Sequence, residues 1–160
     1  MNLYFAGSIS AEREKEAIKI GGISSRLLSY WMILLKNTSA SASSREDYSV
    51  YGIGSGIEGT RYRRNKIAMG TKLFLDSGAY SAFTQGIEID VYEYIEFIKE
   101  NISCIDAYAN LDVIGNPEKT LDNQRIMEKA GLSPIPCFHY GEPVKFLKVY
   151  MEENPYIALG

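Results

Sequence analysis

Lys72-Leu-Phe-Leu-Asp76 is the first of four short apolar runs that set the fold of this chain. The other three runs cover residues 107–112, 134–139 and 156–160. Stretches with helical periodicity separate consecutive runs, which is the pattern of parallel strands joined by crossover helices. The sequence therefore predicts an α/β protein built from repeated βα units.

Three of these runs end on a polar or ionisable side chain, namely Asp76, Asp112 and His139. The carboxyl ends of parallel strands form the floor of the active site in α/β folds. Neighbouring strands lie about 4.8 Å apart, so we expect Asp76 and Asp112 to face one pocket. Two carboxyl groups that lie close together can differ in pKa, so that one serves as a base and the other as an acid or hydrogen-bond partner.

The remaining pattern gives a coarse element order. We expect a strand at residues 2–6, a charged helix from Ser10 to Gly21, and either a strand or a buried helix at 25–35. Residues 37–66 are small, polar and basic, which predicts a mobile loop region. A loop is expected at 77–86 and a helix from Asp90 to Asn101.

The C-terminal part has the clearest helix signals. A strand is expected at 107–113, and the following helix begins with Asn116 as N-cap and Pro117 at the first helical position. That helix is expected to end at Gly131, a good C-cap residue. A strand at 135–139, a helix at 143–153 and a last strand then complete the predicted order.

Composition and charge limit the function classes. The chain has 160 residues, 46% hydrophobic and 23% charged, which suits one soluble globular domain spanning residues 1–160. A net charge of −3 argues against binding nucleic acid over the whole surface. Cys104 and Cys137 share no metal-ligand spacing, so we expect no metal, no cofactor and a reducing, cytoplasmic compartment. No membrane span or secretion signal is apparent.

The motif Asp-Ser-Gly-Ala-Tyr-Ser at 76–81 is the sharpest feature. A carboxylate at a strand end is followed by Ser77 and Gly78, which let a ligand approach the backbone closely. Such a carboxylate can accept two N–H hydrogen bonds from the edge of a purine. The alternative is that Asp76 only caps the turn that follows it.

The other candidate residues lie at the ends of later runs. Asn110 and Asp112 are two positions apart on a strand, so we expect them on one face. The alternative for Asp112 is support of the turn at 115–117. His139, the only histidine, is either a substrate hydrogen-bond partner or a structural residue.

A local basic cluster lies at Arg61, Arg63, Arg64 and Lys66. Phosphate contact is its functional interpretation, and a solvated loop is the alternative that the sequence alone favours. Glycines at 52, 54 and 56 lack the flanking strand, helix and lysine of a phosphate-binding loop.

The number of predicted strands does not fill a closed barrel. A (β/α)8 barrel needs eight βα units and about 250 residues, whereas this chain supplies five or six strands. Three interpretations fit: part of a longer barrel, a barrel that a second chain or copy completes, or a small open sheet. The pattern alone slightly favours the open sheet.

The motif at 76–81 resembles the Asp-Ser-Gly-Gly-Phe-Gln motif of tRNA-guanine transglycosylases. Residues 75–83, 108–114, 136–139 and 156–160 are more similar to phage and bacterial DNA-guanine transglycosylase-like proteins of the deoxypurine-in-DNA protein A kind. The resemblance covers residues 72–160, with departures at Ala79, Tyr80 and Ser81. It implies an incomplete TIM-type barrel and reverses the preference for an open sheet.

The resemblance also implies a pentosyltransferase that exchanges guanine in DNA, more than in tRNA, for a 7-deazaguanine. It makes Asp76 the base-pocket aspartate, with a catalytic role, and Asp112 the second base-recognising aspartate. Further base contacts are expected from Ser77, Gly78, Asn110, His139 and Gly160. The covalent aspartate nucleophile and the zinc site of that family are expected beyond Gly160, so this chain alone is expected to recognise the base without that nucleophile.

Two other functions stay open at this point. The chain can be a nucleic-acid-binding remnant without chemistry, which salt-dependent DNA binding without base exchange would indicate. It can also be a small nucleoside-processing enzyme, because residues 3–7 resemble the first strand of nucleoside deoxyribosyltransferases. Cleavage of free deoxynucleosides would indicate that activity. For a phage protein, the expected compartment is the host cytoplasm.

Overall fold

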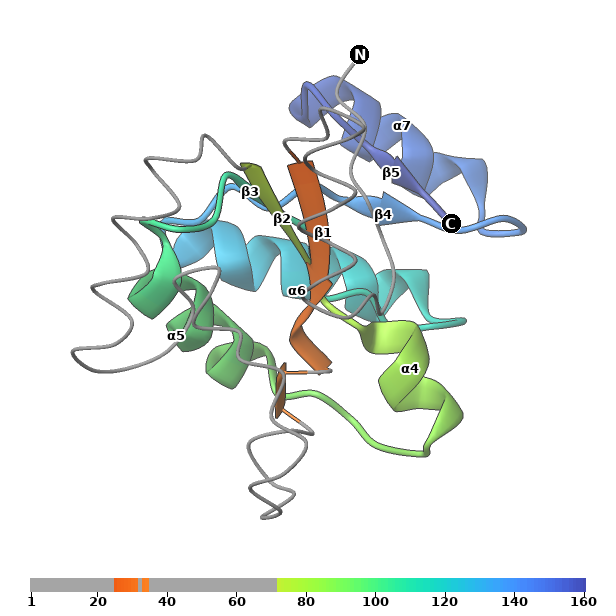
Figure 1. The fold of residues 1–160 in the computed structure, drawn as a ribbon. Coiled ribbons are helices and arrows are strands. Elements are labelled where there is room, and N and C mark those ends of the chain that lie inside the picture. The colour runs from red at the N-terminus through yellow and green to blue at the C-terminus, as the bar shows by residue number, and fades with distance from the viewer. Residues whose placement is uncertain (1–24, 32, 35–71) are drawn as a thin grey trace, which may run out of the picture.

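The computed structural model describes residues 25–31, 33, 34 and 72–160, which form a mixed α/β fold (Figure 1). Its strands are β1 (Ser25–Ser29), β2 (Lys72–Asp76), β3 (Ala107–Tyr108), β4 (Cys137–Phe138) and β5 (Ala158–Leu159). Its helices are α4 (Ala79–Thr84), α5 (Val91–Asn101), α6 (Pro117–Lys129) and α7 (Val144–Glu153). The strand expected at 2–6, the helix expected from Ser10 and the region 37–66 lie outside the described residues.

The described strands are all parallel and follow one another in chain order. One sheet has the order β1-β2-β3, and β4 pairs with β5 in a second. A parallel bridge between Ala109 and Ile135 joins the two sheets: Asn110 N donates to Ile135 O at 2.8 Å, and Ile135 N donates to Tyr108 O at 2.9 Å. Parallel βα units are thus confirmed, with β1 and β5 as the outermost described strands.

Several predicted elements differ in detail. The segment 25–35, left undecided between strand and helix, contains strand β1 at its start. The loop expected at 77–86 is wrong over six residues, because 79–84 form helix α4. The strand expected at 107–113 is shorter: β3 covers Ala107–Tyr108, the bridge at Ala109 follows it, and Val113 N donates to the Thr120 side chain.

Local side-chain caps start the two longer helices where the sequence placed them. Asp90 Oδ1 accepts from Tyr92 N at 2.7 Å and from Glu93 N at 3.1 Å, which satisfies two free amides of α5. Asn116 Oδ1 accepts from Lys119 N at 3.0 Å, with Pro117 as the first residue of α6. These caps fix the residue at which each helix begins.

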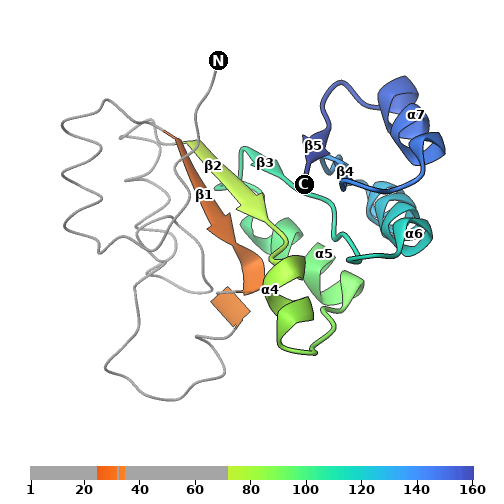
Figure 2. The same cartoon turned by 90° about the vertical axis from the view of Figure 1, so that its right-hand side faces the viewer.

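The hydrophobic core lies between β2 and the helices that follow it. Leu73 and Leu75 of β2 are fully buried and pack with Tyr94 and Ile98 of α5 and with Met127 of α6. In Figure 2, α6 and α7 lie on the same side of β4 and β5. Because side chains alternate along a strand, the side chain of Asp76 points away from the face that buries Leu75.

The described helices include none that is both long and apolar enough to cross a bilayer.

Candidate functional site

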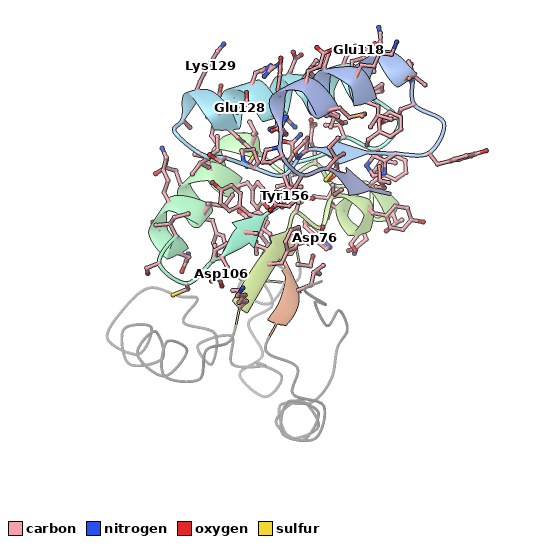
Figure 3. The ribbon with its side chains drawn as sticks, turned by 90° about the horizontal axis from the view of Figure 1, so that it is seen from above. Asp76, Asp106, Glu118, Glu128, Lys129 and Tyr156 are labelled. Atoms are coloured by element: carbon pink, nitrogen blue, oxygen red, sulfur yellow. The ribbon has the colours of Figure 1, made fainter. Side chains whose placement is uncertain are left out.

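The candidate site is built where the parallel strands end. Figure 3 shows Asp76 and Asp106 near opposite ends of β2. Asp106 belongs to the amino end, since its carboxylate accepts from Leu73 N at 2.6 Å. Asp76 is the last residue of β2, and Ser77, Asp112, His139 and Gly160 all follow strand ends.

Asp112 is the centre of the site. Its side chain is only 9% exposed, and its two oxygens have different partners. Ser77 Oγ donates to Oδ1 at 2.9 Å, from 35 residues away, and His139 Nε2 lies 2.9 Å from Oδ2, from 27 residues away. An ionised carboxylate has about four acceptor positions, and the described residues supply donors to two of those at Asp112.

This arrangement differs from a serine hydrolase triad. In such a triad the histidine lies between the serine and the aspartate and takes the proton of the hydroxyl. Here Asp112 lies between Ser77 and His139, so neither neighbour activates the other. Both instead hold the carboxylate in one orientation, so Asp112 is the group positioned to accept a further hydrogen bond.

His139 is held on both sides. Its backbone N–H donates to Glu142 Oε2 at 3.0 Å, and Glu142 N donates back to His139 O at 3.2 Å. The imidazole packs against Gly160, where a Cβ would lie 2.5 Å from Nδ1. A side chain at 160 would therefore require the ring or the chain end to shift, and the expected contact of Gly160 with a base stays a prediction.

Glu142 is a residue that sequence reasoning placed only at a helix start. Its Oε2 closes the 139–142 turn, while its Oε1 is buried and accepts no hydrogen bond from the described residues. A glutamate three residues after a histidine is a weak signal by itself, because the same spacing occurs in many turns.

Of the two alternatives for Asp76, the structure shows the cap of the following turn. Its Oδ2 accepts from Gly78 N at 3.1 Å, so it does cap the following turn. Burial raises the pKa of the Asp76 carboxyl above its ordinary value of 3.8, and the negative charge of Asp112 raises it further. Asp112 lines the cleft beside it and Asp76 does not, so the expectation that both carboxylates face one pocket stays a prediction.

The side chain of Asn110 has a structural task. It is fully buried, and its Nδ2 donates to Thr120 O at 2.9 Å, which ties β3 to helix α6. Its Oδ1 has no partner among the described residues. The expectation that Asn110 and Asp112 share one strand face stays a prediction, because β3 ends at Tyr108 and the segment 110–113 is not part of a strand.

Two further ionisable side chains, Tyr94 and Cys137, interact electrostatically with the carboxylates. The Tyr94 hydroxyl, fully buried, donates to Ala109 O at 3.1 Å. Burial, followed by the charges of Asp76 and Asp112 among others, raises the pKa of Tyr94 and also that of Cys137. Burial therefore favours the neutral form of both groups.

A cleft of about 1000 Å³ opens beside Asp112. Its walls come from α4, the segment 86–91, the segment 111–116 after β3 and the first turns of α6. Asp112 belongs to this lining, whereas its two partners Ser77 and His139 do not. Sequence patterns did not indicate the cleft, because it lies between loops that are distant in the chain.

The basic cluster Arg61, Arg63, Arg64 and Lys66 lies outside the described residues, so its contact with phosphate stays a prediction. Within residues 25–34 and 72–160, as far as they are described, no group of three or more histidine, cysteine or acidic side chains could hold a metal ion.

Comparisons of the chain with protein-family models, with curated proteins and with solved structures found no match.

Proposed function

We propose that this chain recognises a guanine-like base in a base-exchange reaction on DNA or tRNA, as a transglycosylase-like protein. The observation that supports this most is the oriented carboxylate of Asp112, which Ser77 and His139 hold at the side of a cleft. Guanine presents two adjacent N–H donors on one edge, and a carboxylate accepts such a pair in a bidentate manner.

Asp76 supplies the second function in this proposal. A carboxyl group whose pKa is raised can hold a proton and act as a general acid when the base leaves. The glycosidic bond would break as a carboxylate nucleophile bonds to the sugar C1′, and the departing base would take the proton. The incoming base would return a proton to Asp76 as it displaces the carboxylate. The family resemblance places that nucleophile outside the described residues.

The target base must leave the base stack to reach Asp112, because the carboxylate is almost fully buried. Phosphate contacts from Arg61, Arg63, Arg64 and Lys66 are part of the same proposal. They would hold the polynucleotide while one base is exchanged.

Calorimetry with 7-deazaguanine tests the base site directly. We expect measurable binding to the full chain and at least about a tenfold loss of affinity in Asp112→Asn, because a hydrogen bond to a charged group contributes about 1.5–3 kcal/mol. Glu152→Gln, an exposed change on α7, serves as the matched control and is expected to bind like the unmodified chain.

Circular dichroism shows whether Asp112→Asn is still folded, and Asp76→Asn provides a second variant of the same site. Unchanged affinity in a folded Asp112→Asn chain would refute the base site. Exchange of labelled guanine into DNA or tRNA would then distinguish the two polynucleotides.

A further inference from the structure

The cleft beside Asp112 has a chemical character that constrains its ligand. Its volume of about 1000 Å³ is at the upper end of the range of about 300–1000 Å³ for small-molecule sites. It is therefore larger than a single base requires. Its lining residues decide which additional groups a ligand can carry.

One wall of the cleft offers exposed apolar surface. Phe83 on α4 is 58% exposed and Ile87 is 47% exposed, and both belong to the lining. An aromatic ring that stays in solvent at a cleft is suited to stack on a heterocycle. Tyr80, three residues before Phe83, is also exposed but does not line the cleft.

The charged side chains of the lining are mostly acidic. The carboxylates are Glu88, Asp90, Asp112 and Asp122, and among the described lining residues Lys119 is the one cation. The ammonium of Lys119 lies 3.9 Å from Glu88 Oε1, so a neighbouring carboxylate already offsets its charge. A phosphate group in this cleft would meet a net negative field and no unpaired cation of the lining.

We propose that the cleft binds a heterocyclic base or nucleoside without phosphate, stacked on Phe83, and that its carboxylates exclude nucleotides. This inference rests on the proposed function and narrows its substrate class. The free base that takes part in the exchange would enter through the cleft. The phosphates of the polynucleotide would stay outside it.

Guanosine and guanosine 5′-monophosphate form a matched pair of probes, because they differ only in the phosphate. In calorimetry at low ionic strength, where charge repulsion is least screened, we expect the monophosphate to bind at least about tenfold more weakly. The double variant Glu88→Gln with Asp122→Asn removes two carboxylates and leaves Asp112 unchanged. In this variant we expect the affinity for the monophosphate to rise and that for guanosine to stay the same.

The stacking contact is tested by Phe83→Leu, with Tyr80→Leu on the same helix as control. Base–aromatic stacking contributes about 1–3 kcal/mol per base, so Phe83→Leu should weaken guanosine binding by about fivefold or more. Tyr80→Leu should leave it unchanged. Equal losses in both variants would refute the role of Phe83.

The outcomes separate this inference from the proposed function. Equal binding of guanosine and its monophosphate, or no binding of guanosine, would overturn the selectivity proposed for the cleft. Either result would leave the base site intact as long as 7-deazaguanine binds and Asp112→Asn weakens it. Loss of that dependence on Asp112 would overturn the proposed function instead.

Discussion

Asp76 shows how one side chain can serve the turn and the site together. The amide of Gly78 stabilises its ionised form, whereas burial and the charge of Asp112 favour its protonated form. The two opposing effects leave the pKa raised, so burial and repulsion outweigh the hydrogen bond.

This shift predicts a pH dependence of stability. The folded chain binds the Asp76 proton more tightly than the unfolded chain does, so Asp76 costs stability as the pH rises from its unfolded pKa through its folded pKa. Asp76→Asn should therefore raise the free energy of unfolding at neutral pH, and the gain should vanish below about pH 4. Urea denaturation at several pH values measures this. A pH-independent difference would contradict the assignment.

The contact between the end of β1 and the β2–α4 turn depends on one glycine. Gly78 has φ +74°, and a Cβ there would lie 2.4 Å from both Ser29 Oγ and Trp31 Cβ. Ser29 and Asp76 are register partners across β1 and β2, so the turn packs directly onto the strand end beside it. The glycine of the Asp-Ser-Gly motif is thus required by packing between two elements as well as by its backbone conformation.

Comparing Gly78 with Gly86 separates the destabilisation caused by steric overlap from that caused by the left-handed backbone conformation. Gly86 also has a positive φ of +68°, but no atom lies within 4 Å of a Cβ placed there. Gly86→Ala should lower the free energy of unfolding by about 1–2 kcal/mol, because alanine is strained in the left-handed conformation. Gly78→Ala should lower the free energy of unfolding clearly more, because the overlap of its Cβ with Ser29 and Trp31 adds to the same conformational strain. Chemical denaturation measures the free energy of unfolding of the two variants. Similar decreases would show that the end of β1 can shift and relieve the overlap.

At the scale of the molecule, the C-terminal unit (β4, α7 and β5) lies outside the main hydrophobic cluster. The main hydrophobic cluster takes its fully buried members from residues 30–132 and includes none from β4, α7 or β5. The exposed ion pairs of Arg125 with Glu153 and of Lys145 with Glu118 join α6 to α7. Such surface pairs contribute about 0–1 kcal/mol each.

This difference predicts a gradient of hydrogen exchange. The amides of Ala158 and Gly160, which donate to Pro136 O and Phe138 O, should exchange faster than the amide of Ala109, which donates to Leu75 O in the main sheet. Local opening of the C-terminal unit would expose the first two without unfolding the core. Exchange measured by NMR residue by residue tests the order, and equal protection of all three amides would show a single cooperative unit.

The sequence predicted much of the element order because its signals are local. The N-cap at Asn116, the proline at 117 and the apolar face of the helix after Asp90 depend only on neighbouring residues. The sequence missed helix α4, because six residues are too few to show a clear period. It also made the strand after Ala107 too long, because the competing partner, Thr120, comes from another element.

The sequence by itself determined a chain of parallel βα units with Asp76, Asp112 and His139 at strand ends. Only the tertiary structure decided that Ser77 and His139 both bind Asp112, that Gly160 packs on the imidazole, and that Asn110 turns toward Thr120. The physical reason is the range of the interactions. Caps and periodicity act within a few residues, whereas these contacts require strand pairing and loop packing to bring distant segments together.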